Sequence, residues 1–229
     1  MLKPQKKVSR KEIKEDKLVK TYFEAREWVE ENQKIVAYIV AAPLILALLW
    51  FWWHSKTNEW NDNATTMLAK VIPFYDNGRY AETINGVPQE GIQGLQAIVD
   101  EYGSSHTGQI AKLYLANSYY ATKNYDKAFT YYEDVSLSDK MITASAYAGA
   151  GSCYEAKGDF IKAAAYFEKA ASKNMTSIQA PENLQRSAVN YAAAGKKDKA
   201  IELLQTLKKE FPTSSYARDV DRYIAEYNS

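Results

Sequence analysis

The sequence has few of the residues that most enzymatic and metal-binding sites need. Its 229 residues include one cysteine and two histidines, too few for an internal disulfide or a zinc site of the Cys-x-x-Cys type. Its 29 basic and 28 acidic residues nearly cancel, which excludes a broadly cationic surface for nucleic acid. It contains no glycine-rich phosphate loop, no Gly-x-Ser-x-Gly motif and no His-Glu-x-x-His motif. We therefore expect no enzyme, with no catalytic residue, no cofactor and no metal site.

One long apolar run interrupts an otherwise polar sequence. Residues 35–53 contain no charged or amide side chain. As a helix they would span about 28 Å at roughly 1.5 Å per residue, close to the ~30 Å hydrocarbon core of a bilayer. Pro43 lies inside the run, where a spanning helix tolerates it, and the aromatic residues at 50–53 are typical of a membrane interface. The run predicts one transmembrane helix over residues 35–53.

Two other interpretations compete with a spanning helix. A buried core helix would need comparable apolar helices to pack against, and the sequence has no second run of this kind. A cleaved signal peptide would need small residues before its cleavage site, whereas tryptophans end this run and a 34-residue segment precedes it. We therefore expect an uncleaved signal anchor.

Basic residues predict the direction in which the segment crosses. Ten lysines and arginines precede it, and only Lys56 lies within the dozen residues after it. By the positive-inside rule, residues 1–34 are expected in the cytoplasm and residues 54–229 in the periplasm of a diderm bacterium, with the span in the inner membrane. Residues 16–33 should form a helix, which either touches anionic lipid or a partner, or is a solvated extension of the span. Residues 1–10 should be loosely ordered.

From about residue 58 the sequence repeats with a period near 34 residues. Three segments align: 109–140, 144–174 and 181–212. Each has a small residue and then an aromatic residue on a first helix, followed by an alanine on a second: Ala116, Tyr119 and Ala128; Gly151, Tyr154 and Ala163; Ala188, Tyr191 and Ala200. One such unit cannot bury its own apolar face, so stacking must supply the core. We predict an all-α solenoid, with a degenerate unit over 58–106 (a loop at 84–94 included) and a capping helix over 214–227.

This pattern resembles the tetratricopeptide repeat, whose signature is a small residue at position eight, an aromatic at eleven, alanine at twenty and proline at thirty-two. The match is incomplete, because only Pro212 supplies the proline and Lys140 stands in its place in the first unit. The resemblance implies a scaffold that binds other proteins.

The order of the segments gives a closer resemblance. A basic segment, the phrase Trp-Val-Glu-Glu-Asn at 28–32, one apolar run, Val-Asp-Glu-Tyr-Gly at 99–103, the repeats and Phe-Pro-Thr-Ser at 211–214 follow one another. This layout is similar to that of membrane-anchored tetratricopeptide proteins of bacterial envelopes, including the YfgM-like ancillary subunits of the Sec translocon. The resemblance implies contact with a translocon and with periplasmic chaperones or clients. The alternative is a dedicated structural subunit or assembly factor of one inner-membrane complex.

The first helices of stacked repeats line a concave surface, where a peptide or partner helix can bind. The repeat register places eight candidate partner-binding residues there: Ile110, Leu113, Asn117, Tyr120, Ser152, Glu155, Gln185 and Val189. Alternatively, this surface is simply solvated or is filled by a loop of the same chain. We expect no clamp for a terminal carboxylate, because Glu155 and Glu182 stand where cations would be needed. Cys153 should pack as a small apolar residue, and His106 should be a polar turn residue.

Overall fold

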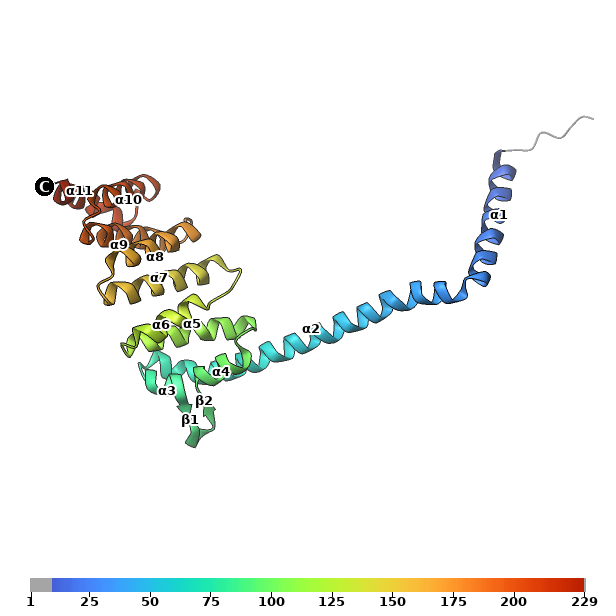
Figure 1. Cartoon of the computed structure of the whole chain (residues 1–229), viewed down its shortest axis with the longest axis horizontal. Coiled ribbons are helices and arrows are strands. Elements are labelled where there is room, and N and C mark those ends of the chain that lie inside the picture. Colours follow the sequence, from blue (N-terminus) through green and yellow to red (C-terminus); the bar gives the residue numbers. More distant parts are fainter. Residues whose placement is uncertain (1–9, 229) are drawn as a thin grey trace, which may run out of the picture. The chain divides into compact units, whose positions relative to one another are not determined.

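The computed structural model describes residues 10–228, and of the side chains in residues 10–18 it describes only that of Lys17 (Figure 1). The predicted loose order of residues 1–10 therefore falls, apart from Arg10, outside the described residues. The chain divides into two units between Lys56 and Thr57, which are described in turn.

The first unit contains α1 (Arg10–Glu31) and the beginning of α2 (Gln33–Asp76). The helix predicted over residues 16–33 corresponds to α1, which ends at Glu31 and is separated from α2 by Asn32. The backbone and side-chain amides of Asn32 both donate to the carbonyl of Trp28 at 2.9 Å. The most apolar 18-residue window of α2 has a mean hydropathy of 2.4, and none of it is buried. Among the described helices, α2 is the one whose length and composition would allow it to cross a membrane.

Helix α2 does not end with the apolar run. It continues without a break to Asp76, because residues 54–63 contain neither glycine nor proline. The expected boundary at residue 54 thus falls inside a helix. From Thr57 onward α2 belongs to the second unit, where it buries Ala64, Leu68, Val71 and Phe74.

The second unit is a stack of antiparallel helix pairs (Figure 1). The pairs are α5 (His106–Ala121) with α6 (Tyr125–Glu133), α7 (Lys140–Ala156) with α8 (Phe160–Lys173), and α9 (Ala180–Ala193) with α10 (Lys197–Glu210). They confirm the solenoid, although each first helix begins one to four residues before the predicted repeat. Side-chain caps explain two of these early starts: Ser105 accepts from the N–H of Gly108, and Asp139 from that of Met141.

The degenerate unit differs from the prediction in one part. After α2 come α3 (Tyr80–Asn85), β1 (Gly86–Val87), the 3-10 helix η1 (Pro88–Glu90), β2 (Ile92–Gln93) and α4 (Leu95–Tyr102). The segment expected to be a loop therefore holds a small antiparallel hairpin, with Val87 opposite Ile92. A side chain at Gly94 would collide with the backbone of Gly86 and Ile84. The close approach of these two segments at the base of the hairpin therefore requires glycine at position 94.

The solenoid closes with η2 (Ser215–Asp219) and α11 (Val220–Asn228). The predicted capping helix thus begins as a 3-10 turn, capped by the hydroxyl of Ser214, which accepts from the N–H of Tyr216 at 3.3 Å. Buried side chains occur in every helix pair of the stack, and they form two clusters, one from α2 to α7 and one from α8 to α11. The small residues expected between paired helices are buried: Ala116, Ala128, Gly151, Ala163, Ala188 and Ala200. Their lack of bulk allows the helices to pack closely.

Candidate functional site: the concave groove

The last part of α2 and the first helices of the pairs run parallel along one side of the second unit. Near the start of α5, the N–H of Thr107 donates a hydrogen bond to Asn61 on α2 at 2.9 Å. Further along, the ring of Tyr75 on α2 meets that of Tyr114 on α5, with 4.9 Å between centroids. Residue numbers therefore increase in the same direction on both helices.

Helices α7 and α9 continue this parallel arrangement. Ser145 near the start of α7 donates to Gln179, which directly precedes α9, at 3.2 Å. Near the end of α7, Glu155 accepts from Asn190 of α9 at 2.6 Å. The N-terminal ends of α5, α7 and α9 thus lie on the edge where the chain enters the unit at Thr57. We call this the entry edge, and the opposite edge, which carries the turns inside each helix pair, the far edge.

A groove of about 440 Å³ lies between these first helices. Its lining residues are Ile110, Leu113, Tyr114 and Asn117 of α5; Met141, Ile142 and Ser145 of α7; and Gln179. The lining is mainly apolar, and none of these residues is charged. Three predicted binding residues, Ile110, Leu113 and Asn117, therefore come together in one groove.

Asn117 is held in place by its own chain. Its side-chain oxygen accepts a hydrogen bond of 2.6 Å from the hydroxyl of Tyr132 on α6. Burial raises the pKa of Tyr132 well above its ordinary value, so this phenol stays a neutral donor. This hydrogen bond fixes the position of the Asn117 side chain, which also lines the groove.

A polar cluster joins α7 to α9 beyond the groove. Glu155 accepts from the guanidinium of Arg186 at 2.5 Å as well as from Asn190, and Arg186 lies 4.0 Å from the ring centroid of Phe167. Arg186 therefore pairs with Glu155, a contact that the sequence register did not show. Glu182 contacts Tyr216, whose pKa is raised by burial first and by the nearby Glu182 carboxylate second.

The other predicted binding residues lie on the first helices but are not among those lining the groove. Tyr120 packs on Tyr125 with ring centroids 5.4 Å apart. The hydroxyl of Ser152 donates to the carbonyl of Ala148. Gln185 is half-buried, and Val189 is 37% exposed. Five lining residues are not among the eight predicted ones: Tyr114, Met141, Ile142, Ser145 and Gln179. Of these, Met141, Ile142 and Gln179 precede the repeat starts chosen from the sequence.

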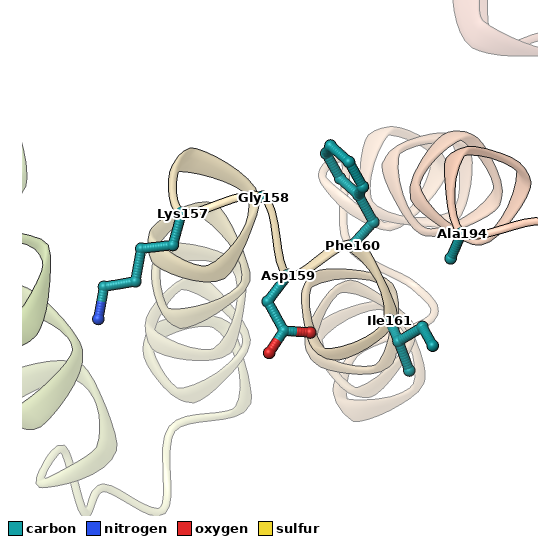
Figure 2. A pocket seen from close by; sticks show the side chains of 6 residues that line it. All are labelled: Lys157, Gly158, Asp159, Phe160, Ile161 and Ala194. Atoms are coloured by element: carbon teal, nitrogen blue, oxygen red, sulfur yellow. The ribbon is translucent and has the colours of Figure 1, made fainter.

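A second, shallower hollow of about 480 Å³ lies on the far edge. Figure 2 shows its lining residues at the turn between α7 and α8, with Ala194 across from Ile161 and the Lys157 side chain pointing away from both. Lys157 pairs with Asp126 of α6, and Asp159 caps α8 by accepting from the N–H of Lys162. The two charged side chains of this hollow thus already have partners within the fold. This favours the concave groove as the binding site.

The described residues offer no alternative reactive centre that geometry supports. No group of three histidine, cysteine or acidic residues able to hold a metal ion occurs among them. Cys153 is 1% exposed, and burial raises the pKa of its thiol to about 12, which suits the predicted packing role. His106 is the first residue of α5 rather than a turn residue.

Comparison with known proteins identifies the repeats. A tetratricopeptide repeat model matches residues 111–136 and 182–214, and a second model of the same name matches residues 144–172. The chain carries tetratricopeptide repeats. The matched segments fall on the three helix pairs that line or support the groove. Tetratricopeptide repeats indicate a scaffold for protein–protein interaction.

Solved structures show the same fold. The tetratricopeptide-like repeats assigned to a kinesin light chain of Podosopora anserina align with a TM-score of 0.56 and 15% identity, covering 73% of this chain and 86% of theirs. A single-residue variant of those repeats aligns with a TM-score of 0.56 and 14% identity, covering 73% and 85%. A search of curated proteins gave no match.

Proposed function

We propose that this chain is a membrane-anchored tetratricopeptide scaffold that binds partner proteins on the outer face of the inner membrane. The observation that carries the proposal is a 19-residue apolar run on α2, unburied in its own unit, that leads directly into a repeat unit. Residues 1–34 are cytoplasmic and residues 54–229 periplasmic, because ten basic residues precede the run and one follows closely.

The partner binds in the concave groove. Because none of the lining residues is charged, the bound segment presents apolar side chains to Ile110, Leu113 and Met141. Asn117, Ser145 and Gln179 supply hydrogen-bonding groups for its backbone. This combination of an apolar floor and a few polar groups is typical of peptide-binding grooves.

The proposed partners are a translocon and periplasmic chaperones or clients. The support is the layout of the sequence, which is similar to that of the YfgM-like ancillary translocon subunits. A dedicated subunit of one other membrane complex would share the anchor and the groove, so the identity and ratio of the partners must distinguish the two.

The test is affinity isolation of the tagged full chain from native membranes in mild detergent, with quantitative mass spectrometry. We expect translocon subunits and chaperones at substoichiometric levels. One complex at a fixed ratio would identify a dedicated subunit instead, and recovery of the chain alone would contradict the scaffold function. Leu113→Gln in the groove should reduce recovery, whereas Ile161→Gln, an equivalent change on the far edge, should not.

The anchor has its own test. The chain should stay with the membrane after alkaline carbonate extraction, and protease added to spheroplasts should digest the repeats while leaving the N-terminal segment intact. Digestion of that segment from outside would overturn the proposed orientation.

A further inference from the structure

Glu182 is a charged residue at one end of the concave groove. It follows Gln179, which lines the groove, by three positions. The N–H of Asn183 donates to the carbonyl of Gln179 at 3.0 Å, so the helical path of α9 already includes Gln179. Residues three positions apart on a helix share one face, with a rise of about 4.5 Å between them. Glu182 is half-buried, and its carboxylate therefore lies at the α9 end of the groove.

The charge of Glu182 is not neutralised by the cation nearest to it on α9. That cation, Arg186, pairs with Glu155 at 2.5 Å and lies over the ring of Phe167. Glu182 accepts instead from the hydroxyl of Tyr216, which is a neutral donor. Two carboxylates thus share one guanidinium, and one negative charge is left over beside the groove.

The neighbouring segments add no net charge to this end of the groove. At the start of α7, Asp139 and Lys140 have opposite signs. Residues 208–228, which close the stack and include Tyr216, contain four basic and four acidic side chains. None of the lining residues is charged. Glu182 therefore sets the sign of the charge that a bound segment meets.

We propose that Glu182 selects a lysine or arginine of the bound segment, so that the groove takes segments in which a basic residue accompanies apolar ones. The inference rests on the proposed function, and it adds the chemistry of the partner. Apolar side chains contact Ile110, Leu113 and Met141, and the cation pairs with the carboxylate of Glu182.

The spacing of the helices sets the spacing of the recognised residues. Packed helices lie about 8–10 Å apart, so roughly this distance separates the groove floor on α5 and α7 from Glu182 on α9. An extended segment advances ~3.3 Å per residue. The basic residue should therefore stand about three positions from the apolar residues.

The test uses the full chain in phosphatidylcholine nanodiscs and short synthetic peptides as the bound segment. Leucines alternate with serines in each peptide, and a lysine, glutamine or glutamate stands three positions after the last leucine. A second set carries the same residue three positions before the first leucine, so that both directions of the bound chain are covered.

Binding is followed by an environment-sensitive fluorophore beside the groove. It is attached to Ile178→Cys, because Ile178 directly precedes Gln179 and is 91% exposed. The native Cys153 is buried and should not label. In one of the two sets, the lysine peptide should bind about two- to fivefold more tightly than the glutamine peptide, the range of an exposed ion pair. The preference should shrink as salt is added.

Two variants of the labelled chain assign this preference to one carboxylate. Glu182→Gln should abolish the preference for lysine, and Glu182→Lys should replace it with a preference for glutamate. Glu133→Gln is the matched control, because Glu133 of α6 also accepts from a tyrosine hydroxyl, that of Tyr166, but is not among the groove residues. It should keep the preference. Circular dichroism confirms that all variants retain their helices.

The outcomes separate this inference from the proposed function. Equal binding of the three peptides, or a preference for lysine that survives Glu182→Gln, would overturn the role of Glu182. If Leu113→Gln still weakens binding in that case, the groove of the proposed function stands. Binding of no peptide would contradict the groove itself, and the inference with it.

Discussion

Two glycines of α7 that look alike in the sequence have different surroundings. A side chain at Gly151 would meet the Phe167 ring at 3.2 Å, a tight but adjustable contact, whereas one at Gly149 would overlap the ring of Tyr132. That ring is 4% exposed and is tied by its hydroxyl to Asn117, so it cannot easily move aside. The repeat pattern identified Gly151 as the small residue, but it gave no sign of the tighter contact at Gly149.

Gly149→Ala should lower the free energy of unfolding by about 1–3 kcal/mol through overpacking. This loss should appear although alanine is favoured over glycine inside a helix by ~1 kcal/mol. The measurement is urea unfolding of the full chain in mild detergent, followed by near-ultraviolet circular dichroism. Gly151→Ala is the matched control and should cost less, and an equal or smaller loss at 149 would contradict the packing described.

The thiol of Cys153 should be nearly inert in the folded chain. With a pKa of about 12, its thiolate fraction at pH 8 is on the order of 10⁻⁴. Alkylation by iodoacetamide, measured by intact-mass spectrometry, should therefore be slow and should rise about tenfold per pH unit. Ile178→Cys supplies an exposed thiol for comparison, and rapid labelling of Cys153 at pH 8 without unfolding would contradict its burial.

The same pKa shift has a consequence for stability. Because burial raises the pKa of the folded thiol above its ordinary value of 9.0, its contribution is fully present below pH 9 and is lost as the pH rises toward 12. Stability should therefore fall over that alkaline range, and Cys153→Ala should show a smaller fall. Unfolding midpoints measured between pH 8 and pH 11 test this, and identical pH profiles would contradict it.

At the scale of elements, the helix pairs were predictable because their period of small and aromatic residues extends over whole repeats. The hairpin at 86–93 was not, since two-residue strands are too short to show the alternation that marks a strand. For the groove, the register identified Ile110, Leu113 and Asn117, which line it together, and their part in binding stays a prediction. Counting inside repeats could not reveal side chains such as Gln179 that join the groove from a preceding turn.

The cluster between α7 and α9 should couple these helices. Glu155 and Arg186 are each about one-third exposed, so solvent screening limits their pair to roughly 1 kcal/mol of coupling. A double-mutant cycle with Glu155→Gln and Arg186→Met, measured by urea unfolding, isolates this value. Fully additive single losses would show that the two side chains do not interact in solution.

At the scale of the whole molecule, the sequence separates an apolar run from the repeats, but the structure joins them in one helix. Composition changes at residue 54, whereas the repeat core begins to bury α2 only at Ala64. Burial depends on contacts with α4 and α5 that are distant in sequence, so the composition could not place the start of the folded unit. The predicted solenoid was nonetheless correct, because stacking follows from the repeats alone.

The unit that begins at Thr57 should fold without the apolar run, because the end of α2 supplies the first layer of its core. Leu68 and Val71 of α2 share one buried cluster with Leu95 and Ile98 of α4. We expect a fragment of residues 57–229 to be soluble and to unfold cooperatively by circular dichroism.

A matched fragment of residues 80–229 lacks that layer. Losing the buried side chains of Leu68, Val71 and Phe74 costs about 1.5–3 kcal/mol each in apolar burial, and it also exposes Leu95 and Ile98 to water. This fragment should therefore be destabilised by on the order of 5 kcal/mol, with a broad transition and aggregation. Equal midpoints for the two fragments would show that α2 is only a tether, with no part in the core of the repeats.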